Sequence, residues 1–331
     1  MKAMVIEQFG APDVFVQREI PKPVPGPGQV LIRVAGSSVN PIDAKIRSGA
    51  VPAIAPAFPA VLHGDVAGTV VARGHGVTRV GVGDAVYACA GGVKGLGGAL
   101  AEFMLADAVL VAHAPATLKL ADAAALPLVG ITAWEALIDR AQVGAGQRVL
   151  VHGGAGGVGH IGVQLAKQRG AIVYTTVSSD EKAALAHALG ADATINYRQK
   201  TVAEYVGAHT NGEGFDVVFD TVGGECLAAS FEAVKVGGTV VTIAARSTQD
   251  LSPLHARGAT LHAVFMLLPL LRSIGRARHG EILGRLAQLV DAGRVRPLLD
   301  PDVFTFARVG AAHAALESGK ARGKIRLAAG W

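Results

Sequence analysis

The residues that most directly indicate chemistry form Gly154-Ala155-Gly156-Gly157-Val158-Gly159, a complete G-x-G-x-x-G. An apolar run over 148–153 precedes the motif and an amphipathic stretch follows it, which predicts a strand-to-helix turn. There Gly154 permits the tight turn, Gly156 lets the backbone approach a pyrophosphate, and Gly159 lets helix and strand pack closely. The helix N-terminus then favours the phosphates. We predict a dinucleotide site lined by Gly154, Gly156, Gly157, Val158 and Gly159.

The end of the second predicted strand should show which dinucleotide is bound. NAD-binding folds of this kind usually place Asp or Glu there, to bind the ribose 2′-hydroxyl. Here the segment "TTVSSDEK" has Ser178 and Ser179 at that place, with Lys182 close behind. A small uncharged side chain near a cation suits a 2′-phosphate, so the pattern favours NADP over NAD. The alternative is structural: Ser178 and Glu181 have the spacing of a capping box, and Lys182 is then an ordinary solvated residue.

Two kinds of pattern predict the elements that carry these residues. Up to about residue 115, short apolar runs with Gly and Pro between them predict an antiparallel β-rich unit. From about residue 120, apolar runs alternate with helical stretches, which predicts an α/β doubly wound parallel sheet. Its six strands are predicted over 148–153, 171–177, 193–196, 216–220, 239–245 and 260–265. The final "GKIRLA" is predicted to be a strand that returns to the N-terminal unit.

Composition excludes several classes of function. The 331 residues suit two domains, and a hydrophobic content of 50% argues against disorder. The net charge is +5, but the Lys and Arg residues are scattered, so nucleic-acid binding is not expected as the main function. Two distant cysteines make neither a disulfide framework nor a zinc ribbon. The apolar run "LHAVFMLLPLL" is too short to span a bilayer. We expect a cytoplasmic protein without a membrane partner.

Several segments together carry a resemblance to a known family. They are "PGPGQVLIRV", "SVNPIDAKIRSG", "GDVAGTVV", "LPLVGITAWEAL", "VLVHGGAGGVGHIGVQLAK", "LGADATINY", "FDVVFDTVGG" and "ARGKIRL". The chain resembles the zinc-independent, zeta-crystallin-like quinone oxidoreductases of the medium-chain dehydrogenase/reductase superfamily. The resemblance implies a GroES-like β-rich catalytic domain from residues 1–120 and 266–331. It implies a Rossmann NADP-binding domain over 121–265, and a homodimer in which the strand 260–265 is paired.

The resemblance also implies roles for single residues. Ser178, Lys182 and Tyr197 match the 2′-phosphate pocket of the family, so the predicted cofactor is NADPH. Asn40 and Asp43 of "NPID" match positions near the nicotinamide and are predicted to be catalytic. The other cofactor contacts that it implies are Thr132, Gly223, Ala244, Phe265, Met266 and Lys324. For Lys324 the alternative is an ordinary solvated lysine.

The zinc alcohol dehydrogenases of the same superfamily are an alternative. They resemble the chain in architecture, but Asn40 stands where their pattern has a cysteine and Asp65 where it has a glutamate, although His63 keeps the histidine. A catalytic zinc needs about three protein ligands and an open position, so we predict no metal. His63 either faces the substrate as a catalytic residue or is a buried histidine with satisfied hydrogen bonds.

Chemistry without a metal must depend on the nicotinamide. We predict hydride transfer from NADPH to a quinone or another activated enone or carbonyl acceptor. Asn40 would bind the acceptor oxygen, and the proton would come from solvent. The mostly apolar segments "IRSGAVPAIAPAFPAVLHG" and "FMLLPLL" favour a small hydrophobic acceptor. A nucleotide-binding protein that senses or scaffolds, with little catalysis, is a further alternative.

Overall fold

The computed structural model describes residues 1–331, which form two compact units. The first consists of Met1–Ile131, Leu267–Gly293 and Pro297–Trp331, and the second of Thr132–Met266 and Arg294–Arg296. We expected the first boundary at residue 120, but the units divide after Ile131. The physical reason is that helix α2 (Leu120–Ala123) packs against strands of the first unit.

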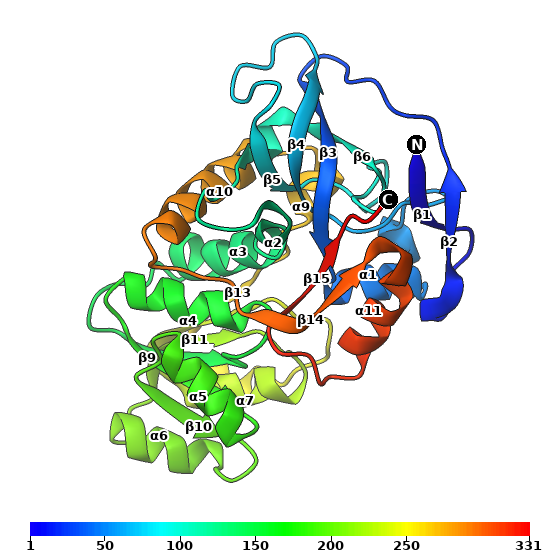
Figure 1. The fold of residues 1–331 in the computed structure, drawn as a ribbon. Helices are drawn as coiled ribbons and strands as arrows, with labels where there is room; N and C mark the ends of the chain where they lie inside the picture. The colour runs from blue at the N-terminus through cyan, green and yellow to red at the C-terminus, as the bar shows by residue number, and fades with distance from the viewer. The chain divides into compact units, whose positions relative to one another are not determined.

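The first unit is built on a seven-stranded sheet (Figure 1). Its strand order is β14-β15-β3-β4-β5-β7, with β6 paired to β3. All pairs except β14 with β15 are antiparallel. The bounds are β3 (Gln29–Ser38), β4 (Asp65–Arg73), β5 (Ala85–Cys89), β6 (Phe103–Asp107), β7 (Ala112–His113), β14 (Leu299–Thr305) and β15 (Lys324–Ala328). Strand β15 confirms that the end of the chain returns to the N-terminal unit.

The other elements of the first unit cover this sheet or extend it. A separate two-stranded sheet consists of β1 (Lys2–Ile6) and β2 (Phe15–Glu19). The helices are α1 (Pro41–Arg47), α2, α9 (Leu268–Arg272), α10 (Arg276–Asp291) and α11 (Val309–Glu317), with short 3-10 turns at Pro12–Val14, Pro52–Ile54, Ala108–Leu110 and Phe306–Arg308. Helix α11 contacts α1, β14 and β15, so it lies close to the start of β15.

The second unit is a six-stranded parallel sheet in the order β10-β9-β8-β11-β12-β13 (Figure 1). The strands are β8 (Arg148–His152), β9 (Ile172–Val177), β10 (Ala193–Asn196), β11 (Phe215–Asp220), β12 (Val234–Thr242) and β13 (Thr260–Ala263). All six predicted strands are present, and β12 begins earlier than the pattern indicated. The doubly wound Rossmann sheet is confirmed.

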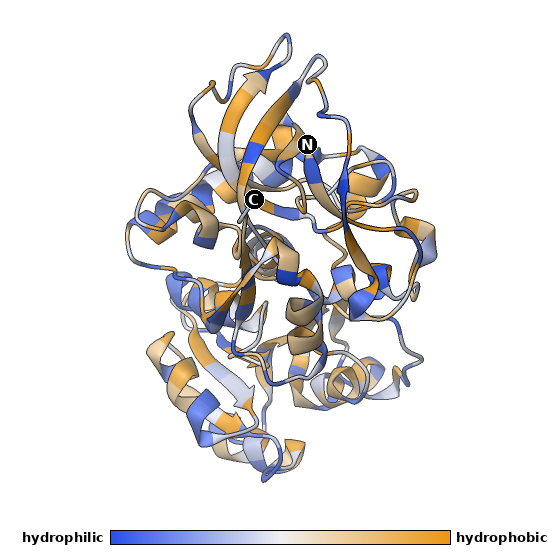
Figure 2. Ribbon diagram, turned by 45° about the vertical axis from the view of Figure 1, so that its right-hand side comes forward, coloured by the Kyte–Doolittle hydropathy of each residue, from blue (hydrophilic) through white to orange (hydrophobic).

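Helices cover both faces of this sheet, so its strands are apolar on both sides. On one face Leu150, Val218 and Val240 form a core with Tyr205 and Phe231. On the other face Gly162 of α4 packs against Phe219, since a Cβ at Gly162 would lie 3.0 Å from that ring. Strands in Figure 2 carry orange stretches, which are hydrophobic. The helices are α4 (Gly159–Gln168), α5 (Asp180–Ala188), α6 (Val202–Thr210), α7 (Glu225–Ala233) and α8 (Ser252–Ala256).

One helical stretch passes the length and composition test for a membrane span. It is Leu120–Arg140, which includes α3 (Pro127–Trp134) and a π-helical turn (Glu135–Arg140). In the structure 72% of its most apolar window is buried, and buried core helices pass the same test.

Candidate active site

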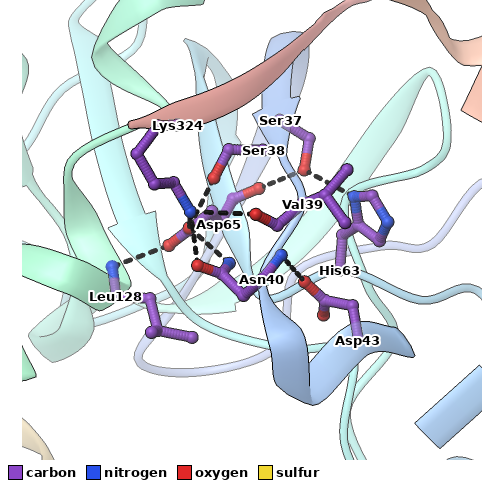
Figure 3. Close-up of polar contacts among 9 residues, drawn as sticks. All are labelled: Ser37, Ser38, Val39, Asn40, Asp43, His63, Asp65, Leu128 and Lys324. Atoms are coloured by element: carbon purple, nitrogen blue, oxygen red, sulfur yellow. Dashed lines mark hydrogen bonds and ion pairs between the residues drawn. The ribbon is translucent and has the colours of Figure 1, made fainter. Parts of the chain in front are cut away.

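A buried polar cluster lies in the first unit where three strand ends meet (Figure 3). Asn40 follows β3 and is the N-cap of α1, while Asp65 and Lys324 are the first residues of β4 and β15. Strand β3 pairs with both β4 and β15, which brings Lys324 to Asn40 across 284 positions of the chain. None of the three residues is more than 2% exposed. Pairing between distant segments therefore builds this cluster.

The Asp65 carboxylate is surrounded by hydrogen-bond donors. Its Oδ2 accepts from Ser38 Oγ at 2.7 Å and from Asn40 Nδ2 at 2.8 Å, and its Oδ1 accepts from the Leu128 N–H at 2.8 Å. Lys324 Nζ lies 3.8 Å from Oδ2. Burial raises the pKa of Asp65, whereas Lys324 and the hydrogen bonds lower it, and burial lowers the pKa of Lys324. Because every partner of the carboxylate is a donor, we assign Asp65 as ionised and Lys324 as its ammonium counter-ion.

Asn40 is held at both ends of its side-chain amide. Its Oδ1 accepts a hydrogen bond from Lys324, and its Nδ2 donates to Asp65. Its backbone N–H donates to Asp43 Oδ2 at 2.8 Å. Burial, and then the charge of Asp65, raises the pKa of Asp43 to about 7. The structure thus brings the predicted catalytic residues Asn40 and Asp43 together: one N–H of the Asn40 amide donates to Asp65, and the same amide also interacts with the Asp43 carboxyl.

His63 belongs to a separate chain of hydrogen bonds. Ser37 Oγ donates its proton to the Asp65 carbonyl at 2.7 Å, so His63 Nδ1, 3.2 Å away, must donate to Ser37. His63 Nε2 then accepts from His313 Nε2 at 2.9 Å. Burial lowers the pKa of His63, and burial together with Arg47 lowers that of His313 to about 3. Both ring nitrogens of His63 are occupied and the residue is fully buried, so it fits the structural alternative rather than the predicted catalytic role.

The donor set near Asn40 does not fit a zinc ion. No group of three or more His, Cys, Asp and Glu side chains in the structure is arranged to hold a metal. The amide oxygen of Asn40 is already bound by the Lys324 ammonium. A positive charge at that place would repel a metal cation rather than help to bind it.

The predicted dinucleotide turn lies in the second unit between β8 and α4. Gly153 (φ 72°) takes the left-handed conformation, which corrects the role given to Gly154. Gly154 is restricted by contact instead, since a Cβ there would lie 2.1 Å from Thr175 Oγ1, to which its N–H donates at 2.9 Å. A Cβ at Gly159 would lie 2.1 Å from the Gly153 carbonyl oxygen. The first turn of α4 therefore packs directly on the loop, as predicted for Gly159.

The remaining residues of the loop are more accessible. Gly156 is exposed, and Gly157 and Val158 are half-buried. Val158 is the N-cap of α4, a helix of ten residues. The first N–H groups of a helix carry partial positive charge, and in α4 those of His160 and Ile161 already donate to the Gly156 and Val158 carbonyls. An exposed glycine backbone at this helix start fits a pyrophosphate group.

Two further predicted cofactor positions lie side by side in the second unit. A Cβ at Gly223 (φ 84°) would lie 2.5 Å from the Ala244 carbonyl oxygen. Asp220, at the end of β11, accepts from the Gly223 N–H at 2.9 Å and from Thr242 Oγ1 at 2.7 Å. This buried carboxylate fixes the loops after β11 and β12, and so positions Gly223 and Ala244.

The other predicted contacts differ in exposure. Thr132 in α3 is 4% exposed and Met266 is also 4% exposed, whereas Phe265, just after β13, is 45% exposed. Lys324 is 2% exposed, so the solvated alternative for it is wrong. Contact between these four residues and a cofactor stays a prediction.

The proposed 2′-phosphate residues gather at the ends of β9 and β10. Ser178 follows β9, and the Tyr197 N–H donates to the Val177 carbonyl at 3.2 Å, which places Tyr197 beside Ser178. Ser179, not Ser178, caps α5, because its side chain accepts from the Lys182 N–H at 3.4 Å. The capping box expected for Ser178 is therefore wrong, and its hydroxyl is not used as the helix cap. Tyr197 is 54% exposed.

The partners that hold Asn40 are not among the residues that we predict for the acceptor site. The zinc pattern marks Asp65 only as a poor metal ligand, yet a carboxylate at the start of the apolar strand "DVAGTVVA" must find donors when it is buried. The resemblance assigns Lys324 to the cofactor. His313, a buried polar residue in the middle of the apolar helix "VGAAHAALE", carries the same kind of signal.

Comparison with known proteins agrees with this arrangement. A family described as alcohol dehydrogenase GroES-like domain matches residues 26–116, and one described as zinc-binding dehydrogenase matches residues 189–327. The chain is 34% identical to the chloroplastic NADPH-dependent alkenal/one oxidoreductase of Arabidopsis thaliana, over 98% of this chain and 78% of that protein. It is 30% identical to the quinone oxidoreductase of Rattus norvegicus, over 90% of this chain and 89% of that protein.

A solved structure is similar over the whole length. The crystal structure of an alcohol dehydrogenase superfamily protein from Novosphingobium aromaticivorans has a TM-score of 0.95 and 45% identity, and the match covers 100% of both chains. The glycine turn, the six-stranded parallel sheet and the GroES-like unit all agree with these matches. The chain therefore belongs to the quinone oxidoreductase family of the medium-chain dehydrogenase/reductase superfamily, and it is an oxidoreductase that uses a nicotinamide cofactor.

Proposed function

We propose that the chain is an NADPH-dependent reductase that transfers a hydride to a quinone or an enone without zinc. The observation that carries this proposal is the Asn40 amide, held between the Lys324 ammonium and the Asp65 carboxylate. An asparagine stands where the zinc members of the superfamily have a cysteine, and a protein cation already occupies its oxygen. Such a site can bind a carbonyl oxygen through an amide N–H without a metal.

The second unit supports NADPH over NADH. The end of β9 has no acidic side chain that would repel a 2′-phosphate, and Ser178, Lys182 and Tyr197 come from three neighbouring segments. A lysine, a hydroxyl and a phenol are suitable donors to a phosphate dianion. Asp180 and Glu181 lie in the first turn of α5, where they favour the helix dipole. The name of the Arabidopsis relative also includes NADPH dependence.

In the proposed reaction the chain orients the acceptor and excludes water. Bound NADPH would supply the hydride, which goes to the β-carbon of an enone or to a quinone, and solvent supplies one proton. The second N–H of the Asn40 amide would bind the acceptor oxygen and stabilise the negative charge that develops there. Asp43 holds the backbone of Asn40, which limits the movement of that donor. The apolar segments 46–64 and 265–271 favour a small uncharged acceptor.

We propose further that the protein acts as a homodimer. Strand β13 is at the edge of the six-stranded sheet and pairs only with β12. A free edge of this kind is normally paired, covered or protected. Pairing between the β13 strands of two subunits would satisfy it, and size-exclusion chromatography with light scattering would test the assembly.

Steady-state turnover tests the proposed activity. NADPH oxidation is followed at 340 nm with 1,4-benzoquinone and with a short enone such as methyl vinyl ketone, with and without a chelator. We expect turnover with at least one acceptor, unchanged by the chelator. Loss of activity on chelation and recovery with Zn²⁺ would favour a zinc alcohol dehydrogenase. Tight NADPH binding without turnover of either acceptor would favour a sensing or scaffold role.

A further inference from the structure

Lys324 is a buried cation enclosed by oxygen atoms of its own chain. Its Nζ donates to the Val39 carbonyl at 3.1 Å and to Asn40 Oδ1, and it lies 3.8 Å from Asp65 Oδ2 (Figure 3). An ammonium group has three N–H donors, and three oxygens surround this one. The residue is 2% exposed. Its charge is therefore directed into the polar cluster, where two of its three N–H groups donate hydrogen bonds and the third lies toward the Asp65 carboxylate.

Lys324 and Asp65 both polarise the Asn40 amide, and their effects add. The ammonium draws electron density toward Oδ1, and the Asp65 carboxylate accepts from one N–H at 2.8 Å. Hydrogen bonds arranged in this way strengthen one another, and they do so more in a buried site than in water. The second N–H of the same amide becomes a stronger and better oriented donor. No other cationic side chain donates a hydrogen bond to this amide.

We propose that Lys324 is a positioning residue that acts through Asn40 as an internal cation. It fixes and polarises the amide so that the second N–H of Asn40, which faces Asp43 in the structure, binds the acceptor oxygen, and it does not bind the cofactor. This inference rests on the proposed function, because it names the group that prepares the acceptor site. It replaces the cofactor contact that the family resemblance implied for Lys324.

Lys324→Met tests the inference, because methionine has a similar length without charge. We expect the Kd for NADPH to stay within about twofold, while kcat/KM for the enone falls at least about tenfold, the size expected for losing a charged hydrogen bond. The loss should be smaller with 1,4-benzoquinone, which needs less activation of its oxygen. Lys320→Met, four positions earlier and exposed, is the matched control and should change neither quantity. A rise in the Kd for NADPH with an unchanged acceptor step would overturn the inference.

A double-mutant cycle separates action through Asn40 from an independent effect. Asn40→Ala and Lys324→Met are each compared with the double variant in kcat/KM for the enone. If Lys324 acts through Asn40, the double variant should be no slower than Asn40→Ala alone. If the two losses multiply, the residues act independently and the inference is wrong. If the wild type turns over no acceptor, the proposed function itself has failed, which is a different result.

Loss of a buried cation could prevent folding, because Asp65 would be left without its counter-ion. The variant Lys324→Met with Asp65→Asn removes both charges and restores neutrality. Folding is checked by circular dichroism and thermal melting. We expect this variant to bind NADPH like the wild type and to show the same loss in kcat/KM for the enone. Wild-type kcat/KM in this neutral variant would contradict the inference.

Discussion

The Asn40 cluster of the first unit differs in burial from the residues proposed to bind a 2′-phosphate in the second unit, Ser178, Lys182 and Tyr197. Asn40, Asp65 and Lys324 are buried, and every charge has a partner within the chain. In the second unit Tyr197 is 54% exposed, and Ser178 and Lys182 are half-buried. The side chains of the Asn40 cluster are ordered by contacts within the chain. The donor groups of the second unit are instead accessible to a ligand.

This difference suits the two regions to different functions. A donor that must meet charge developing during a reaction gains from being fixed in advance, because nothing then has to reorganise. A site that only distinguishes two cofactors by a phosphate needs affinity, and exposed donors can supply it. Changes in the buried cluster should therefore affect stability and the acceptor step, and changes in the exposed group should affect cofactor choice.

The largest effect on stability is expected for Asp65→Asn. The change leaves the Lys324 ammonium buried without its counter-ion, and breaking a buried pair costs about 3–5 kcal/mol of unfolding free energy. Glu213→Gln removes the partner of Arg148 in the second unit, where the carboxylate is 71% exposed. That surface pair should contribute no more than about 1 kcal/mol. Urea unfolding measures the loss of unfolding free energy in both variants. Equal losses would show that the buried pair stabilises the chain no more than the surface pair does.

Gly159→Ala should weaken binding of both NADPH and NADH. The new methyl group would lie 2.1 Å from the Gly153 carbonyl oxygen, so the loop must move away from α4. The shifted loop should lose a charged hydrogen bond to the pyrophosphate, worth about 1.5–3 kcal/mol, so both Kd values should rise at least about tenfold in fluorescence titration. In the control Gly207→Ala, the methyl group meets no atom within 4 Å and stands inside helix α6. That control should bind normally and gain about 0.5–1 kcal/mol of stability.

His313 should make the free energy of unfolding depend measurably on pH. Its pKa is about 3 in the folded chain and 6.5 when unfolded, so protons favour the unfolded state. The stabilisation is complete above pH 6.5 and is lost as the pH falls toward 3. Between pH 7 and pH 5 the wild type should lose about 2 kcal/mol more than His313→Gln.

Only the difference in the pH dependence of stability between the wild type and His313→Gln is informative. Asp43, with a pKa raised to about 7, gains stability over a similar range as the pH falls, which opposes the effect of His313. Both proteins share that contribution, so it cancels. Parallel pH profiles of unfolding for wild type and His313→Gln would show that the buried histidine pair is not neutral.

The smallest effect separates two neighbouring serines. Ser178→Ala should raise the Kd for NADPH about fivefold, the effect of one hydrogen bond, and leave the Kd for NADH unchanged. Ser179→Ala removes the cap of α5, so it should cost about 1 kcal/mol of stability without changing the preference between the cofactors. Isothermal titration and thermal melting of both variants measure these effects. If Ser178→Ala lowered stability and Ser179→Ala weakened NADPH binding, Ser178 would be the cap of the helix in solution.

The fold was predictable from the sequence because its signals are local. Apolar runs defined the six strands of the Rossmann sheet, and the G-x-G-x-x-G motif placed the turn after β8. Details that depend on neighbouring residues were not predictable, such as the left-handed conformation of Gly153 and the cap at Ser179. Both lie one residue from the predicted position.

The candidate site was predictable only in part. Asn40 and Asp43 lie in one short motif, so local sequence and family resemblance found them together. The contact between Lys324 and Asn40 spans 284 positions, and that between His63 and His313 spans 250. No local pattern encodes such pairs. They follow from the return of β15 to β3 and from the packing of α11, which only the assembled sheet reveals.

We propose that cofactor choice and acceptor activation are separate functions of two groups of residues. The most direct test measures the Kd for NADPH and kcat/KM for an enone in Lys182→Ala and Lys324→Met, with NADH as the second cofactor. We predict that Lys182→Ala weakens NADPH about tenfold, as loss of a charged hydrogen bond should, and leaves NADH unchanged. Lys324→Met should leave both Kd values unchanged and slow only the acceptor step. Equal binding of NADPH and NADH to the wild type, or a weaker NADPH complex in Lys324→Met, would contradict the claim.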